Sequence, residues 1–296
     1  KMANVNIQEL LNNGVHFGHL TRKWNPNMAP YIYTERNGVH IIDLYKTAAK
    51  IEETSEALKK IANSGRKILF VATKKQAKDI VAEKAKAISM PYITERWPGG
   101  MLTNFVTIRK AVKKMAIIDR MKTDGSFDAL SKREKLQINR QREKLEKNLG
   151  SISDMTRLPG ALFVVDIKKE HIAVAEAQKL NIPIFAMVDT NSDPRQVDYV
   201  IPANDDASKS INVVLSFVTG AIADGLSERK ADKEKVKEAP KKEEAKVEAP
   251  KAEVAAPEVE EAKVETPAKK EAPKAKAPKK AKKKADVAET PAEEKK

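Results

Sequence analysis

Continuous apolar runs and helical repeats alternate through the middle and second half of the chain. Five short runs predict strands, at residues 67–73, 91–94, 161–166, 182–188 and 199–201. They lack polar alternation, as expected of strands buried on both faces of a parallel sheet. Apolar residues at helical spacing follow in residues 74–89, 173–180 and 206–223. The alternation predicts an α/β fold, a doubly wound parallel sheet of about five strands.

Helix-capping signals mark several of the predicted boundaries. Thr73 with Gln76, and Ser131 with Glu134, have the spacing of capping boxes. Asp205 is placed to cap the helix that begins near residue 206.

Residues 103–150 interrupt the alternation with two helical patterns and no strand signal. Ile108, Val112 and Met115 mark the first helix, and Leu145 and Leu149 the second, with a turn around Gly125. Each apolar stripe is narrow and the remaining positions are charged. This pattern predicts an antiparallel, coiled-coil-like helical hairpin that protrudes from an α/β domain spanning residues 2–226.

The two ends of the chain differ from this core. Residues 1–66 predict two helices, at 7–13 and 43–63, separated by an irregular stretch rich in Asn, Pro and aromatic residues. Residues 231–296 contain seven prolines, no aromatic residue and 19 Lys against 16 acidic residues. Such a segment buries too little apolar surface to offset its ordering entropy, so we expect a disordered tail.

Charge and composition narrow the function classes. The formal net charge is +14 and there is no cysteine, which excludes disulfide scaffolds, thiolate metal sites and a cysteine nucleophile. No run of about eighteen apolar residues and no signal peptide is present, so we expect a cytoplasmic protein without a membrane segment. A basic body favours a polyanionic partner, with nucleic acid ahead of a membrane surface.

Tests for enzyme chemistry give weak signals. No glycine-rich phosphate loop follows the first strand, although Lys74 and Lys75 at a helix start could meet a phosphate or be ordinary solvated lysines. Asp166, Asp189, Asp193 and Asp205 follow predicted strands, but each can serve as a turn former or helix cap. We therefore predict no enzyme activity and no cofactor.

Metal binding is also weakly indicated. His16 and His19 have a spacing that could ligate a metal, yet no carboxylate or thiol lies near them in the sequence. Packing or an RNA hydrogen bond is the preferred role of these histidines.

Two loops combine cations, an indole and amides, which is the mixture that RNA recognition favours. Residues 21–27 read TRKWNPN, with Arg36 and Asn37 soon after, and residues 96–104 read RWPGGMLTN. The alternative is that both tryptophans are core anchors.

These loops also carry a resemblance to a known family. The chain resembles bacterial members of the small-subunit ribosomal protein two family, over residues 2–225. The matching stretches, in family order, are GVHFGH at 14–19, WNP at 24–26, RNGVHIIDL at 36–44, GGMLTN at 99–104, LPGALFVVD at 158–166, IPIFAMVDTNSDP at 182–194 and IPANDD at 201–206. Pro98 stands where the family usually has Leu, Gly160 where an acidic residue is common, and the tail exceeds the usual family length.

The resemblance implies a flavodoxin-like sheet and a structural role in the small ribosomal subunit, between its head and body. It also implies small-subunit ribosomal RNA and neighbouring ribosomal proteins as partners, including the mRNA-capturing small-subunit protein one. We expect the RNA contacts to come from the following residues: Arg22, Lys23, Trp24, Asn25, Arg36, Asn37, Lys74, Lys75, Arg96, Thr103, Asn104 and Arg109.

Overall fold

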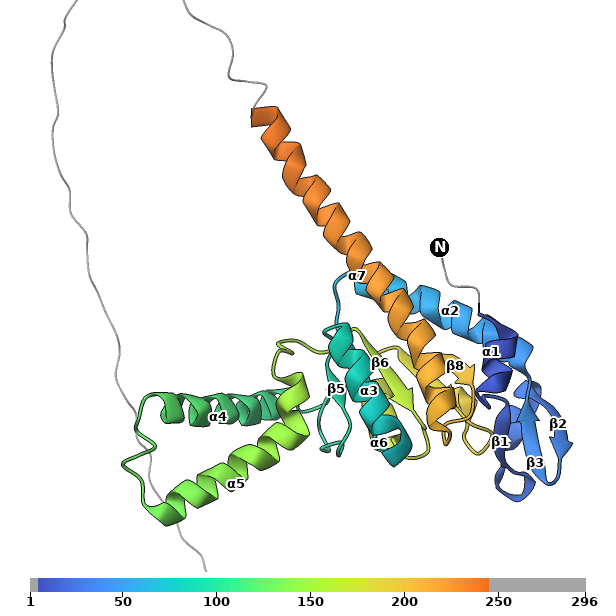
Figure 1. The fold of residues 1–296 in the computed structure, drawn as a ribbon, viewed down its shortest axis with the longest axis horizontal. Helices are drawn as coiled ribbons and strands as arrows, with labels where there is room; N and C mark the ends of the chain where they lie inside the picture. Colours follow the sequence, from blue (N-terminus) through green and yellow to red (C-terminus); the bar gives the residue numbers. More distant parts are fainter. Residues whose placement is uncertain (1–4, 245–296) are drawn as a thin grey trace, which may run out of the picture. The chain divides into compact units, whose positions relative to one another are not determined.

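The centre of the fold is a five-stranded parallel sheet. A computed structural model of the chain describes the backbone of residues 5–244 and the side chains of residues 5–232, all within one compact unit (Figure 1). The strands are β4 (Ile68–Val71), β5 (Tyr92–Ile93), β6 (Ala161–Val165), β7 (Ile184–Val188) and β8 (Tyr199–Pro202). Their order, β5-β4-β6-β7-β8, is the flavodoxin-like order, and all pairs are parallel. The five predicted strands and the α/β fold with a parallel sheet are confirmed.

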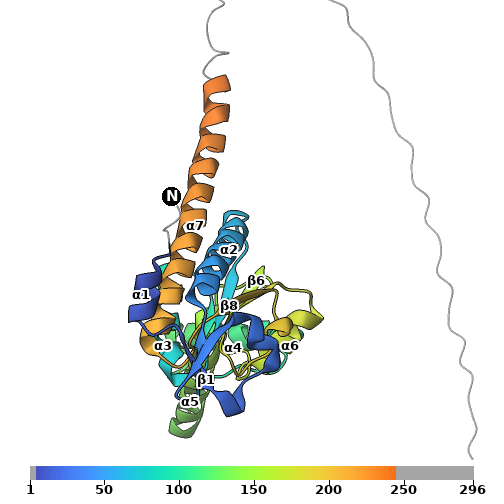
Figure 2. The ribbon, with the colours of Figure 1, turned by 90° about the vertical axis from the view of Figure 1, so that its right-hand side faces the viewer.

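Alternate residues of each strand enter two apolar layers. Phe70, Phe163 and Phe185 lie in the layer covered by α2 (Leu44–Asn63), α3 (Lys75–Ala87) and α7 (Ser208–Glu244). Leu69 and Leu162 lie in the opposite layer, covered by α6 (His171–Lys179), by the loop around Trp97 and by the base of the hairpin. Figure 2 shows α2, α3 and α7 on their side of the sheet and α6 on the other. Burial on both faces explains why the strands are apolar throughout.

Helix α7 is the core helix that the sequence predicted, but it is longer. By length and hydropathy alone its Ser208–Asp232 segment could cross a membrane, although the sequence pattern predicts no membrane segment. Ile211, Val214, Leu215 and Val218 are completely buried against the sheet and its neighbouring helices, as in the core of a water-soluble domain.

The predicted boundary at residue 231 falls inside α7, which continues to Glu244. The correction has a local cause: residues 226–239 contain no proline and are rich in Glu, Lys, Arg and Ala, which favour helix. The remainder of the predicted disordered tail, residues 245–296, lies outside the described residues.

The stretch predicted as irregular between the first two helices is a small antiparallel sheet. It follows α1 (Ile7–Asn12) and consists of β1 (Phe17–Leu20), β2 (Ile32–Arg36) and β3 (Val39–Ile42), in the order β1-β3-β2. Two short 3-10 turns, η1 (Thr21–Lys23) and η2 (Pro26–Tyr31), connect β1 to β2. No side chain of β1 or β2 is buried, β3 has only four residues, and the register shifts in both pairings, so no clean alternation marked the sheet in the sequence.

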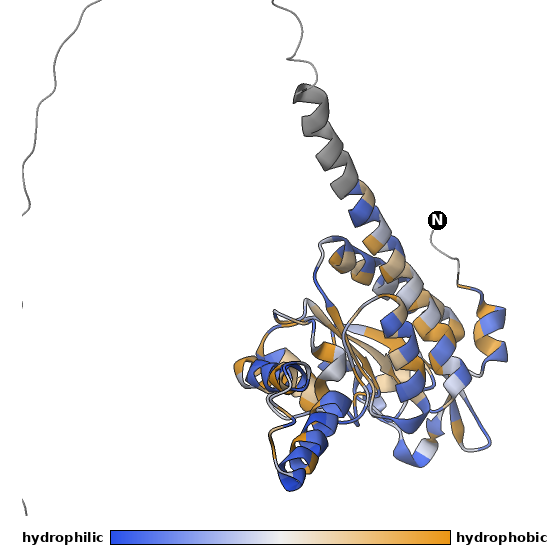
Figure 3. Cartoon of the chain, turned by 60° about the vertical axis from the view of Figure 1, so that its left-hand side comes forward, coloured by the Kyte–Doolittle hydropathy of each residue, from blue (hydrophilic) through white to orange (hydrophobic). Residues whose placement is uncertain are grey.

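The helical hairpin consists of α4 (Phe105–Thr123) and α5 (Lys132–Leu149), which pack against each other. The predicted Ser131–Glu134 capping box is present at the start of α5. Figure 3 shows hydrophilic residues over much of both helices. At the base, however, Ile108, Val112 and Leu145 pack against the second apolar layer of the sheet domain.

Two other capping predictions are wrong. Thr73 and Gln76 form no capping box, because the Thr73 backbone N–H donates to Glu170 Oε1 at 2.9 Å and α3 begins without a side-chain cap. The turn before α7 is held by Asn204, whose Oδ1 accepts from the backbone N–H groups of Asp206 and Ala207. Asp205 therefore does not cap α7, and its carboxylate can form other contacts.

Candidate functional site

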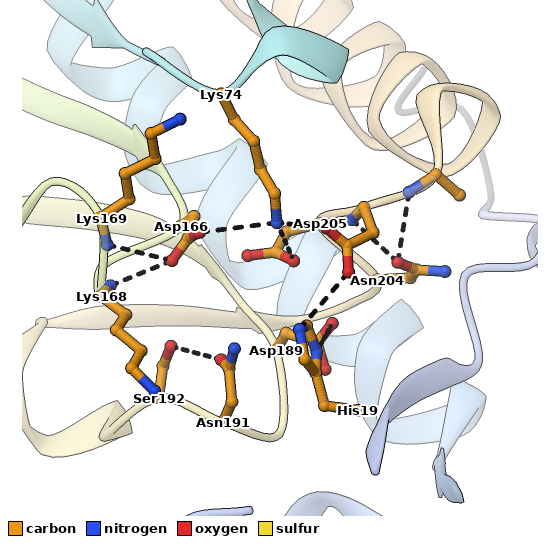
Figure 4. A network of polar contacts seen from close by, with 12 residues as sticks. His19, Lys74, Asp166, Lys168, Lys169, Asp189, Asn191, Ser192, Asn204 and Asp205 are labelled. Atoms are coloured by element: carbon orange, nitrogen blue, oxygen red, sulfur yellow. Dashed lines mark hydrogen bonds and ion pairs between the residues drawn. The ribbon is translucent and has the colours of Figure 1, made fainter. Parts of the chain in front are cut away.

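Charged side chains gather at the carboxyl edge of the parallel sheet, where several strands end together. We call this group the strand-end cluster (Figure 4); its members are His19, Lys74, Asp166, Asp189, Asp205 and Asp206. The Lys74 Nζ lies 2.8 Å from Asp205 Oδ1, 2.6 Å from Asp206 Oδ1 and 3.5 Å from Asp166 Oδ2. One lysine therefore balances carboxylates that follow two different strands.

His19 brings the small antiparallel sheet into contact with this edge. Its Nδ1 lies 2.9 Å from Asp189 Oδ2, and its Nε2 lies 3.4 Å from Asp206 Oδ2. Its backbone N–H donates to Thr190 Oγ1 at 2.8 Å. The close approach requires Gly18, because a Cβ at that position would stand 2.6 Å from Thr190 Cγ2.

The ionisation of the cluster follows from its burial. Burial, together with the neighbouring Asp189 and Asp166 carboxylates, raises the pKa of Asp205 to about 7, against the opposing effect of Lys74. The hydrogen bond to Asp189 raises the pKa of His19 above its usual value. Burial alone would lower the pKa of Lys74, but hydrogen bonds to Asp205 and Asp206 outweigh it, so the ammonium stays charged.

The cluster offers nitrogen and oxygen atoms that could bind a cation. Ligand atoms of His19, Asp205 and Asp206 lie within 4.8 Å of one another, a spacing that could hold a divalent metal ion. The sequence missed these carboxylates as partners of His19, because they come from residues 186 or more positions away. His16 is not in this group: its ring lies 4.1 Å from that of Phe17, and burial lowers its pKa.

The two lysines proposed as phosphate contacts have different surroundings. Lys74 belongs to the strand-end cluster, and its ion pairs leave no free charge for a phosphate. Lys75, at the first position of α3, is exposed and forms no ion pair with any described residue.

A basic surface is formed where η1 meets the β2–β3 turn. The Thr21 N–H donates to Gly38 O at 3.0 Å, which places Arg22 and Lys23 beside the turn that carries Arg36 and Asn37. These four side chains are exposed, and within the described part of the chain their cations have no carboxylate partner. Trp24 completes the surface: 38% of it is exposed, and its ring centroid lies 5.0 Å from that of His40. Asn25 instead caps η2, with its Oδ1 accepting from Asn27 N–H at 2.9 Å.

The second predicted RNA-binding loop, at the base of the hairpin, is held by a buried carboxylate. Glu176 of α6 is 8% exposed and accepts hydrogen bonds from Trp97 Nε1 at 3.1 Å and from the backbone N–H groups of Gly100 at 2.8 Å and Leu102 at 2.9 Å. Trp97 is thus a core anchor, whereas Trp24 is not. Burial alone would raise the pKa of Glu176, but these hydrogen bonds outweigh it and lower the pKa.

The remaining predicted contacts flank this loop. Arg96 and Arg109 are exposed and, among the described residues, form no ion pair. Thr103 is tied to Glu176 through both its N–H and its hydroxyl, and Asn104 accepts a hydrogen bond from the Thr107 hydroxyl at 2.8 Å. Glu176 itself was missed, because one acidic residue in a helical pattern carries no signal of its distant partners.

Comparison with known proteins gives one consistent result. Residues 10–225 match the family model described as ribosomal protein S2. The chain is 79% identical over 234 residues to the small ribosomal subunit protein uS2 of Flavobacterium johnsoniae, covering 79% of this chain and 92% of that protein. It is 67% identical over 245 residues to the protein of the same name from Parabacteroides distasonis, covering 82% and 88% of the two chains. The corresponding protein of Bacteroides fragilis is 62% identical over 259 residues, covering 85% and 93%.

Proposed function

The chain belongs to the ribosomal protein S2 family, and we propose that it binds small-subunit ribosomal RNA between the head and body of the subunit. Membership of this family makes it a structural ribosomal protein of the small subunit, not an enzyme. To this family role the proposal adds the RNA partner, the surface through which the chain contacts that RNA, and a cytoplasmic location.

One observation carries the RNA proposal. Most of the cations selected from the sequence are exposed, and within the described part of the chain they are not neutralised by carboxylates; they are Arg22, Lys23, Arg36, Lys75, Arg96 and Arg109. A free cation gains affinity for RNA by releasing counterions from phosphates, whereas a paired cation must first lose its partner. Trp24 adds an exposed aromatic face on which a base can stack.

Sedimentation of a cell lysate tests this proposal. We expect the chain to sediment with the small subunit in a stoichiometric amount and to remain there in modest salt. Recovery in the soluble fraction would contradict the proposal. Recovery with particular messenger RNAs instead of subunits would indicate a free RNA-binding regulator.

We also propose that the chain helps to dock small-subunit protein one. The support is the family resemblance alone. Subunits assembled without this chain should lose protein one and regain it when the purified chain is added. Unchanged retention of protein one would contradict this part of the proposal.

A further inference from the structure

We propose that a pocket at the base of the hairpin binds one unstacked nucleotide of RNA. The pocket has a volume of about 460 Å³ and lies between the loop that begins at Arg96 and the C-terminal half of α5. The inference rests on the proposed function in that it takes RNA as the partner. The lining residues are Arg96, Pro98, Gly99, Gln141, Lys144, Leu145, Asn148 and Leu149.

The chemistry of the lining fits a nucleotide. Two exposed cations, Arg96 and Lys144, stand at the pocket, and no carboxylate lines it. The acidic neighbour of Arg96, Glu95, is occupied by Lys78 at 2.9 Å and Lys147 at 3.4 Å. The local charge available to a ligand is therefore positive, which suits a phosphate.

Apolar and amide groups supply the other parts of such a site. Pro98, Leu145 and Leu149 provide surface for the face of a base. The Gln141 amide and the amide oxygen of Asn148, whose Nδ2 donates to Lys144 O at 2.9 Å, can bond to base edges or to a 2′-hydroxyl. Specific RNA recognition depends on this combination, since unstacked bases are read by apolar or aromatic surfaces and by hydrogen bonds to their edges.

Both walls of the pocket are fixed without a ligand. Glu176 holds the loop wall through Trp97 and Gly100, which flank Pro98 and Gly99. On the other wall, Leu149 is 5% exposed and packs in the second apolar layer. A preformed pocket avoids the entropy cost of ordering its walls during binding.

Four other cavities lack this combination. Asp154 lines the pocket beside Tyr92, Glu9 and Glu52 line the one between α1 and α2, and Asp198 lines the one beside Arg195. The cavity beside Arg109 and Lys113 has cations but only about 90 Å³. Ligand pockets usually measure about 300–1,000 Å³, a range that includes the hairpin-base pocket.

Gly99→Leu is the sharpest test, because it adds bulk at the pocket without removing a charge. No heavy atom stands within 4 Å of a Cβ placed at Gly99, and its φ lies outside the left-handed region, so the fold should accept the side chain. Binding of the full chain to small subunits depleted of it should weaken about tenfold. That factor corresponds to about 1.4 kcal/mol, within the range of about 1–3 kcal/mol for a lost base platform. The salt dependence of binding should not change.

Matched variants separate the pocket from general effects. Gly220→Leu places the same side chain in open space on α7 and should bind as the unmodified chain does. Lys144→Ala should weaken binding and reduce the log–log salt slope by roughly one unit. Lys132→Ala removes an exposed cation from the other end of α5, away from the pocket. It should leave the occupancy of the pocket, and the affinity that depends on it, unchanged.

A photoreactive side chain identifies the occupant. With p-benzoylphenylalanine in place of Gln141, at the pocket, we expect one dominant crosslink to an unpaired nucleotide. With it in place of the exposed Leu136, farther along α5, that crosslink should disappear.

Unchanged binding by Gly99→Leu, or a crosslink from position 141 to protein instead of RNA, would overturn the nucleotide site while leaving the proposed function intact. Failure of the unmodified chain to bind depleted subunits would contradict the proposed function itself.

Discussion

Lys74 and Lys75 are adjacent in the sequence and have opposite surroundings. Lys74 is 13% exposed and meets three carboxylates of the strand-end cluster, whereas Lys75 is exposed at the start of α3. The sequence offered no reason to separate them, since both follow the first strand of the sheet. Only the positions of Asp166, Asp205 and Asp206, far along the chain, distinguish the two.

Replacing each lysine in turn tests this distinction. Lys74→Met leaves the fully buried Asp205 without its cation, so the free energy of unfolding should fall by about 2–4 kcal/mol. Lys75→Met should change it by less than about 0.5 kcal/mol, as expected for a surface residue. Urea unfolding at pH 7 measures both values. Equal effects of the two substitutions would show that the cluster does not depend on Lys74.

The lowered pKa of Glu176 predicts that the stability of the fold depends on pH. Its pKa is lowered in the folded protein, so the folded state binds a proton less readily than the unfolded state does. The stability that Glu176 contributes is therefore present above the unfolded pKa and is lost as the pH falls through the folded pKa.

Glu176→Gln should destabilise the fold by about 2–3 kcal/mol at pH 7, because it loses hydrogen bonds to a charged acceptor. The difference from the unmodified chain should shrink as the pH is lowered below the ordinary range of a carboxyl group. Denaturant unfolding at several pH values between 7 and 3 gives the comparison. A difference that stays constant down to the lowest pH would contradict the assignment of the pKa shift.

At the scale of elements, the helices and strands that are most buried were the easiest to predict from the sequence. The strands of the main sheet were predictable because both of their faces are apolar, and α5 because its capping box and stripe are local signals. Strands β1 to β3 were not, since β1 and β2 have no buried side chain, β3 has only four residues, and the register is irregular in both pairings. The strand-end cluster was predictable only in part: the sheet rule placed the aspartates and Lys74 at one edge, but nothing local placed His19 among them or showed that Lys74 pairs with them.

The hairpin has a base that belongs to the sheet domain and a distal part that does not. Ile108, Val112 and Leu145 pack against the second apolar layer, whereas Arg142 of α5 pairs with Asp119 of α4 farther out. The narrow stripe therefore serves two functions: the base contributes to the core, and the distal part holds the two helices together.

Two deletions should separate these parts. Replacing residues 116–144 with a short Gly/Ser turn keeps the base and should leave a cooperative unfolding transition with little loss of stability. Replacing residues 106–147 also removes Ile108, Val112 and Leu145, and should cost several kcal/mol more, since each half-buried side chain contributes roughly 1–2 kcal/mol. Thermal unfolding measures both. Loss of cooperativity in the shorter deletion would show that the whole hairpin is core.

At the scale of the whole molecule, net positive charge is concentrated before residue 245. The hairpin, residues 105–149, has 13 Lys and Arg against 6 Asp and Glu, whereas residues 245–296 have 14 Lys against 11 acidic residues in a longer segment. Together with the free cations near Trp24, this distribution favours the residues before 245 as the source of the proposed RNA affinity.

Truncation tests the minor role of the C-terminal segment. A chain ending at Glu244 retains the Glu228–Lys59 ion pair and the contact of Arg229 with Gly65, so its fold should be unaffected. Incorporation into small subunits at physiological salt should fall by less than about twofold, because the removed net charge is small and spread over many residues. Failure of the truncated chain to enter subunits would mean that this segment anchors the protein.

The most direct test of the account is the salt dependence of binding to small subunits depleted of this chain. Replacing Arg22, Lys23 and Arg36 together with Ala should flatten the log–log salt slope by about two to three units, because each free cation releases counterions from roughly one phosphate. Trp24→Ala should weaken binding by on the order of 1–3 kcal/mol with little change of slope, since it removes a stacking surface and no charge. An unchanged slope in the triple variant would contradict the account and show that this surface faces protein or solvent.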